Sequence, residues 1–298
     1  MKKSLRTGGI VAGFAAYVWW GGLPLYLVLV GEAGPWEIVG ARILFSLVFC
    51  LVILAMTREL VSTFKALRSR KVAGLTALAG VLIFINWLFY IIASLTGHVV
   101  EASLGYFINP LVTVLLGVIV LGEKLRPLQW AALGFAAVAV VILVVGYGQF
   151  PWLAFILAGS FGVYGLVKNR VGSQLSSTAS LTLETAWLLP VAIAILVWES
   201  ASGTLAAATD PGFFVLLALA GPITAIPLLL FGAAARRVPL AWMGFMQYVS
   251  PTIQLLVGVL VLSEPMPLQR LLGFILVWVG LVVLAIDVIR AERRPVSQ

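Results

Sequence analysis

Long apolar segments separated by short polar breaks make up most of this sequence. Each apolar segment runs for about 20 residues, the length of an α-helix that crosses a bilayer, whereas a membrane β-strand alternates apolar and polar positions over about 10 residues. Segment length and the polar breaks predict ten transmembrane helices, over residues 9–30, 37–56, 72–95, 101–121, 127–147, 151–168, 180–198, 212–233, 240–262 and 267–289. The predicted fold class is therefore an all-α integral membrane protein.

Composition agrees with this pattern. Hydrophobic residues make up 62% of the 298 residues and charged residues only 10%, whereas soluble domains carry about 25% charged residues. Such a chain can expose its apolar outer faces only where lipid replaces water. One cysteine, Cys50, and one histidine, His98, give no disulfide framework and no zinc spacing, so neither a metal nor another cofactor is expected.

The basic residues predict the orientation of the chain. With the N-terminus in the cytoplasm, 17 of the 19 lysines and arginines fall in cytoplasmic tails and loops, and only Arg42 and Arg270 do not. Cytoplasmic loops of membrane proteins carry this excess of basic residues. We therefore expect a multi-pass protein of a bacterial-type inner membrane with both termini cytoplasmic, and we attribute the net charge of +8 to topology and not to nucleic-acid binding.

An internal repeat divides the chain into two halves. Residues recur at an offset of 141 positions. The recurring pairs are Asn109-Pro110 with Ser250-Pro251, Glu123 with Glu264, Gly117 with Gly258, Gly80 with Gly221, and Asn86 with Pro227. Residues 1–147 thus predict one five-helix repeat and residues 148–298 a second. An odd number of helices per half inverts the second repeat in the membrane, which is a transporter architecture with its solute site between the halves.

Two stripes of polar residues, one in each half, are the main candidates for that site. Each stripe lies on one face of its helix, at positions i, i+3 and i+7. The first stripe is Tyr106, Asn109 and Thr113, and the second is Gln247, Ser250 and Gln254. Pro110 and Pro251 fall within the stripes and are expected to kink the helices. The stripes could line a wet cavity, or they could only join helices by hydrogen bonds worth about 0.6–2 kcal/mol each.

Three further residues are candidates for the cavity, and one further proline is a candidate helix kink. Asn86, in an apolar helix, contacts either the solute or a kinked backbone, or it makes an interhelical hydrogen bond. Its repeat counterpart Pro227 is expected to kink the eighth helix. Trp20 lies too deep for an interfacial aromatic belt, so it is a candidate cavity wall. Tyr248 lies beside the second stripe and could stack on a ring of the solute.

Arg42 and Glu184 are charged residues within predicted helices and are candidates for gating or coupling. Arg42 could instead extend outward toward Glu37 or Glu101. The two charges lie on opposite sides of the midplane, separated by roughly 15 Å at the rise of an α-helix, so a direct ion pair is not expected. Each charge could bias one gate. Alternatively, Glu184 could couple transport to protons, because burial favours a protonated carboxyl group.

Several of these residues belong to a recognisable sequence pattern. The segment Glu101-Ala-Ser-Leu-Gly-Tyr-Phe-Ile-Asn-Pro110, with Asn86-Trp87, Leu121-Gly-Glu123 and Gly244-Phe-Met-Gln-Tyr248, resembles RarD-type permeases of the EamA branch of the drug/metabolite transporter superfamily. The resemblance extends over nearly the whole chain. It implies ten helices in two EamA-like repeats and movement of a small metabolite or drug across the inner membrane. It supplies no catalytic residues.

These observations predict a secondary transporter, a permease or exporter that works by alternating access around a cavity at the membrane midplane. An expected lack of charge at mid-depth favours a neutral, zwitterionic or amphipathic organic solute. The alternatives are a membrane-embedded enzyme, which the lack of paired carboxylates and metal ligands argues against, and a channel-like or accessory subunit. The expected partners are the small solute and the lipid bilayer, without nucleic acid, and a homodimer is compatible with the sequence.

Overall fold

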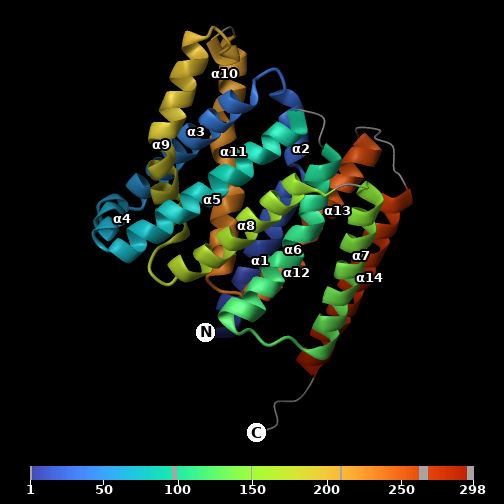
Figure 1. The fold of residues 1–298 in the computed structure, drawn as a ribbon. Coiled ribbons are helices and arrows are strands. Elements are labelled where there is room, and N and C mark those ends of the chain that lie inside the picture. The colour runs from blue at the N-terminus through green and yellow to red at the C-terminus, as the bar shows by residue number, and fades with distance from the viewer. Residues whose placement is uncertain (1, 96–98, 149, 209, 262–267, 294–298) are drawn as a thin grey trace.

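The computed structural model describes residues 2–95, 99–148, 150–208, 210–261 and 268–293, and this part of the chain forms helices joined by turns (Figure 1). The long helices are α1 (Lys2–Gly21), α3 (Pro35–Met56), α5 (Arg70–Leu95), α6 (Val99–Leu121), α7 (Pro127–Tyr147), α8 (Trp152–Val171), α9 (Ser177–Ala201), α11 (Ala220–Ala235) and α14 (Leu268–Arg293). The shorter ones are α2 (Leu23–Leu29), α4 (Leu60–Lys65), α10 (Pro211–Ala218), α12 (Leu240–Gln247) and α13 (Val249–Leu256). Single turns are η1 (Ala66–Arg68), η2 (Ala206–Ala208) and the π-helical η3 (Val257–Val261).

Three of the predicted spans are each divided into two helices. α1 and α2 share the first span, α10 and α11 the eighth, and α12 and α13 the ninth. The breaks after α10 and α12 fall at Leu219 and Tyr248, each three residues before a proline, Pro222 and Pro251. Proline has no N–H to donate to the carbonyl four residues earlier, so the helix is weakened just before it. By contrast, α6 and α11 continue past Pro110 and Pro227.

The helices have the length and surface of membrane spans. Among the described residues, nine helical segments are long and apolar enough to cross a bilayer, and α14 contains a shorter apolar stretch, Leu271–Val283. Large apolar side chains such as Val28, Ile119 and Val145 are exposed. Apolar outer faces of this kind match the acyl chains of lipid. The prediction of an all-α membrane protein with about ten helices is therefore confirmed.

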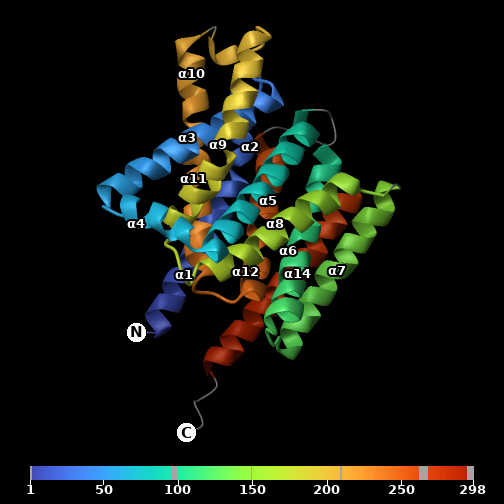
Figure 2. The same cartoon turned by 60° about the vertical axis from the view of Figure 1, so that its left-hand side comes forward.

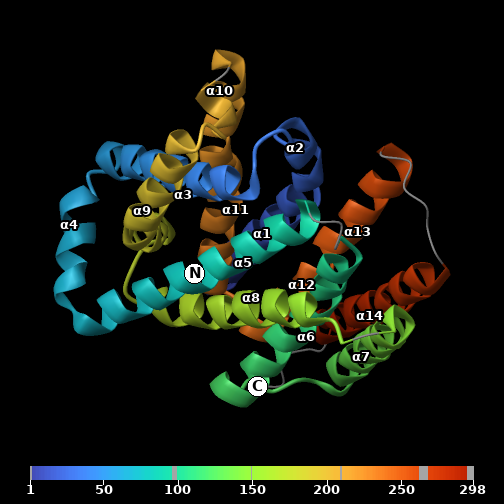
Figure 3. The same ribbon diagram turned by 45° about the horizontal axis from the view of Figure 1, so that its top comes forward.

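The two halves of the chain pack through contacts that occur in exchanged pairs. α5 of the first half contacts α9, and α11 of the second half contacts α3. In the same way, the contact between α5 and α8 corresponds to the contact between α11 and α1. The contact between α6 and α8 corresponds to the contact between α13 and α1. Figure 1 shows α7 and α14, the last helix of each half, side by side, and Figure 3 shows α5 and α8 side by side across the bundle. The predicted repeats would exchange these contacts if a pseudo-two-fold axis related them.

The beginning of α1 and the end of α14 lie at the same end of the bundle, as Figure 2 shows. An even number of crossings places both ends of a chain on one side of a membrane.

Candidate functional site

A cavity lies between the two halves of the chain. Its walls come from α1, α3, α5, α6 and α8 and from the divided helix α12–α13. The space between the lining residues measures about 710 Å³, including the part that is open to solvent. Of the nine residues predicted for the cavity, seven line it: Trp20, Asn86, Tyr106, Asn109, Gln247, Ser250 and Gln254.

The two polar stripes thus meet at one cavity, and they also contact each other. The hydroxyl oxygen of Thr113 lies 3.5 Å from Asn109 Oδ1 and 3.4 Å from Gln247 Oε1, which joins α6 to α12. Thr113 is buried one turn beyond Asn109 and is not among the lining residues. Gln254 Nε2 donates to the carbonyl of Trp20 at 3.2 Å, which joins α13 to α1. Cavity lining and interhelical bonding therefore occur in the same stripes.

Two other candidates differ in their surroundings. Asn86 borders the cavity, and its Nδ2 donates to the carbonyl of Leu157 (3.0 Å) and to Ser160 Oγ (3.2 Å), so it also joins α5 to α8. Tyr248 does not line the cavity: it is buried in an apolar cluster with Phe107, and its hydroxyl donates to the carbonyl of that residue at 3.4 Å. Tyr248 lies at the break between α12 and α13.

Arg42 lies in the cavity wall, and this corrects two expectations. The side chain is only 4% exposed, its Nε donates to Thr224 Oγ1 at 3.0 Å, and its guanidinium lies 4.8 Å from the ring centroid of Trp87. It does not extend toward Glu37, whose carboxylate accepts hydrogen bonds from the backbone of η2. The side chain of Glu101 lies outside the described residues. The cavity is therefore not uncharged: packing of α3 against α11 directs this cation inward.

Aromatic rings from α1, α8 and α11 pack together at the cavity wall. Trp20 and Phe161 line the cavity and meet edge to face, with ring centroids 5.5 Å apart. Phe231 contacts Phe161 at 5.2 Å and stacks on Tyr164 at 5.9 Å, with the two rings nearly parallel. Tyr17 completes this aromatic layer through Trp20 and Phe231.

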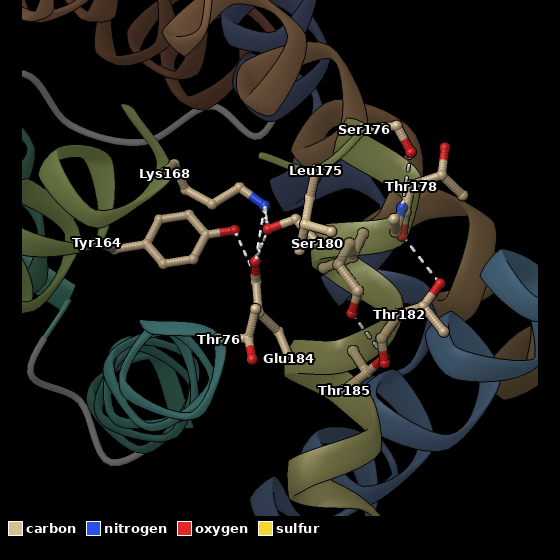
Figure 4. A network of polar contacts seen from close by, with 12 residues as sticks. Thr76, Tyr164, Lys168, Leu175, Ser176, Thr178, Ser180, Thr182, Glu184 and Thr185 are labelled. Atoms are coloured by element: carbon tan, nitrogen blue, oxygen red, sulfur yellow. Dashed lines mark hydrogen bonds and ion pairs between the residues drawn. The ribbon is translucent and has the colours of Figure 1, made fainter. Parts of the chain in front are cut away.

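Figure 4 shows a buried ion pair beside Tyr164, a member of the aromatic layer. Lys168 Nζ lies 2.7 Å from Glu184 Oε1, and the two side chains are 2% and 0% exposed. The hydroxyl of Tyr164 donates to Glu184 Oε2 at 3.0 Å, and Ser180 Oγ lies 2.9 Å from Lys168 Nζ. Because Lys168 lies seven residues beyond Phe161 on α8, the pair is about 10 Å further along that helix than the cavity wall.

The ion pair corrects the predicted position of Lys168. The sequence placed this lysine at the end of the sixth span and counted it among the cytoplasmic basic residues, but α8 continues to Val171 and Lys168 is buried within it. The sequence spacing could have indicated this network. Tyr164 and Lys168 lie four residues apart on one helix face, and so do Ser180 and Glu184. Arg42 and Glu184 have separate partners, Thr224 and Lys168.

Sequence reasoning did not select four aromatic residues of the cavity wall: Tyr17, Trp87, Tyr90 and Phe161. Tyr90 lies one helical turn after Asn86, and its ring meets that of Tyr106 edge to face at 5.7 Å. Tyr17 lies one turn before Trp20. Helical spacing from the predicted residues would have found these two, whereas Phe161 depends on how α8 packs against α1.

A bundle of membrane-length helices around a cavity built from both halves defines a multi-pass membrane protein of the permease class. The model of the EamA-like transporter family matches residues 7–145. Protein RarD of Streptomyces exfoliatus is 45% identical over 98% of this chain and 92% of its own length. The chain belongs to the EamA-like transporter family and is a permease of the RarD type.

Other relatives agree with this assignment. The uncharacterized transporter YojE of Bacillus subtilis is 41% identical over 98% of both chains. Protein RarD of Escherichia coli is 36% identical over 99% of both chains. One solved crystal structure matches 96% of this chain and 99% of its own, with a TM-score of 0.70 and 19% identity, and so shares the fold.

Proposed function

We propose that the protein is a secondary transporter that moves a small organic solute across the cytoplasmic membrane by alternating access around the cavity. The observation that carries the proposal is the meeting of the two polar stripes, from opposite halves of the chain, at one cavity. A site shared by two inverted halves can be opened to either side of the membrane by rocking one half against the other. Trp20, Asn86, Asn109 and Gln247 are the proposed solute contacts.

The divided ninth span supports a moving element at this site. α12 ends at Gln247, α13 begins at Val249, and the π-helical turn η3 follows. Discontinuous helices at the cavity are a recurring feature of transporters, and π-helical turns are frequent at functional sites. Because Gln247 and Ser250 stand on either side of the break, a change of angle between α12 and α13 would alter the cavity wall directly.

An enzymatic reaction is not proposed for this cavity. Two of the relatives carry the name of an uncharacterized transporter, and the described lining residues include no pair of carboxylates that could serve as acid and base. The remaining alternative, a channel-like or accessory protein, would share the fold and differ in kinetics. No nucleic-acid partner is proposed.

We place both termini in the cytoplasm of a bacterial-type cell. The aromatic layer and the Lys168–Glu184 pair then separate the cavity from the cytoplasm. Glu184 has two proposed roles at this position: with Arg42 it could bias the opposing gates, or it could carry a coupling proton.

Two measurements test the proposed function. Metabolites are first compared between cells that lack and cells that overproduce the protein, and the solutes that change are then assayed with the purified protein in liposomes. We expect saturable, protein-dependent movement of at least one solute. A flux that rises linearly with concentration would favour a channel, and no difference between cells or liposomes would contradict transport.

A further inference from the structure

We infer that Arg42 binds the carboxylate of the transported solute, so that the solute class is a small organic monoanion with an apolar or aromatic body. This inference rests on the proposed transport function and adds the chemistry of the solute. It replaces the uncharged or zwitterionic solute that the sequence alone favoured.

Arg42 has free hydrogen-bonding capacity in the cavity wall. Its Nε is used by Thr224, but its Nη1 is buried without a hydrogen-bond partner among the described residues. The side chain is 4% exposed and borders the cavity. A guanidinium presents its donors in a fixed planar fork that matches the two oxygens of a carboxylate.

Among the described side chains, no carboxylate pairs with Arg42. Lys168, which is also buried, has Glu184 at 2.7 Å, whereas the partners of Arg42 among the described side chains are a hydroxyl and the ring of Trp87. A cation held in the membrane interior is unfavourable unless an anion or strong dipoles compensate it. The Trp87 ring supplies part of this compensation, and a solute carboxylate would supply the rest.

The surroundings of Arg42 select the body of the solute. Trp87, Tyr90, Tyr106 and Trp20 present aromatic surface around the cavity, and such surface favours an apolar or aromatic group. A single guanidinium balances a single negative charge. A phosphate dianion would leave one negative charge without a partner in this cavity, so we commit to a monocarboxylate.

The test compares matched pairs of small molecules on the purified full-length protein. Phenylacetate, indole-3-acetate and hexanoate are titrated against their primary amides, and binding is measured by calorimetry and by thermal shift. Each amide has the shape of its acid without the charge. We expect at least one carboxylate to bind about 10–100-fold more tightly than its amide, the range that a charge-assisted hydrogen bond provides. Inorganic phosphate should not displace it.

Variants connect this preference to Arg42. Arg42→Gln should reduce the carboxylate preference to about twofold or less, and Arg42→Lys, which keeps the charge without the fork, should retain part of it. Arg170→Gln removes an exposed arginine at the end of α8 and should leave the preference unchanged. If Arg42→Gln does not fold, the acid–amide comparison on the unmodified protein and on Arg42→Lys still decides the question.

The outcomes separate this inference from the proposed function. Equal binding of acids and amides, absence of carboxylate binding, or an unchanged preference in Arg42→Gln would overturn the role of Arg42. Saturable transport of a neutral solute, with the same kinetics in Arg42→Gln, would also overturn the role of Arg42. The proposed transport function would then still hold. Absence of any transported solute would remove both.

Discussion

Lys168 and Glu184 form an ion pair that is shielded from both water and lipid. Lys168 Nζ lies 2.7 Å from Glu184 Oε1, and neither side chain is more than 2% exposed. Tyr164 and Ser180 complete the hydrogen bonds of the pair. The pair joins α8 to α9, the first two helices of the second half. Removal of one member leaves a buried charge without a partner, whereas removal of both does not.

This asymmetry gives the first prediction. Lys168→Met and Glu184→Met should each lower the free energy of unfolding by about 3–5 kcal/mol, and the double variant should lose less than either single one. Thermal unfolding of the purified protein in detergent measures the difference. Arg170→Met, at an exposed position of the same helix, should change stability by less than about 0.5 kcal/mol. Additive losses in the double variant would contradict a coupled pair.

Proton coupling by Glu184 gives a separate prediction. A neutral amide cannot carry the proton, so Glu184→Gln in liposomes should abolish the response of transport to an imposed pH gradient while solute exchange without a gradient continues. Lys168 and Tyr164 are the titratable groups that contact this carboxylate. Transport that still follows the pH gradient in Glu184→Gln would exclude this role.

The polar stripes give the third prediction. Asn109→Leu and Gln247→Leu replace cavity-lining amides by side chains of similar size that cannot hydrogen-bond. Loss of one hydrogen bond to the solute should lower kcat/KM by about tenfold. Thr185→Val serves as the control, since among the described residues the Thr185 hydroxyl bonds to carbonyls of its own helix. If both leucine variants fold and transport normally, these residues do not bind the solute.

Glu123 gives the fourth prediction, at the end of α6. Its carboxylate accepts hydrogen bonds from the backbone N–H groups of Leu240 (2.6 Å) and Ala241 (2.7 Å), at the beginning of α12. A negative charge at a helix N-terminus is favourable. Glu123→Ala should therefore lower the free energy of unfolding by about 1–2 kcal/mol, measured by thermal unfolding. Lys124→Ala, at the exposed neighbouring position, should have little effect, and equal losses in the two variants would exclude the cap.

The sequence located the spans well because apolar length alone decides them. The start and end of α3 and α7 differ from the predicted ranges by at most two residues. The helix breaks were harder to place, because a proline weakens the helix before it but neighbouring contacts decide whether the helix divides. Thus Pro251 follows a break at Tyr248, while α6 continues past Pro110.

The site could be predicted only as far as helical periodicity reaches. The spacing of Asn109 and Gln247 placed each on the polar face of its helix, and both line the cavity. Periodicity does not show which helices pack together, and that packing decides which residues surround each charged side chain. Arg42 turns inward because α11 supplies Thr224, and Lys168 is buried because α9 supplies Glu184.

Gly80 and Gly221, which are 141 positions apart in the sequence, give the fifth prediction and test the repeat itself. A Cβ added to Gly80 would lie 2.8 Å from the carbonyl oxygen of Glu184 on α9, and one added to Gly221 would lie 2.5 Å from that of Phe45 on α3. Each glycine thus permits the third helix of one repeat to approach the second helix of the other. Backbone atoms cannot move aside as flexible side chains do.

Gly80→Ala and Gly221→Ala should therefore each lower the free energy of unfolding by about 1–3 kcal/mol, although alanine is the better helix former. Gly134→Ala on α7 is the matched control, because its added Cβ meets no atom within 4 Å, and it should be neutral or stabilising by up to about 1 kcal/mol. Thermal unfolding of the three variants in one detergent gives the comparison. Similar losses at Gly80 and Gly221 would indicate that the two crossings are equivalent, as an inverted repeat requires, whereas a loss at only one of them would show that the symmetry does not extend to these contacts.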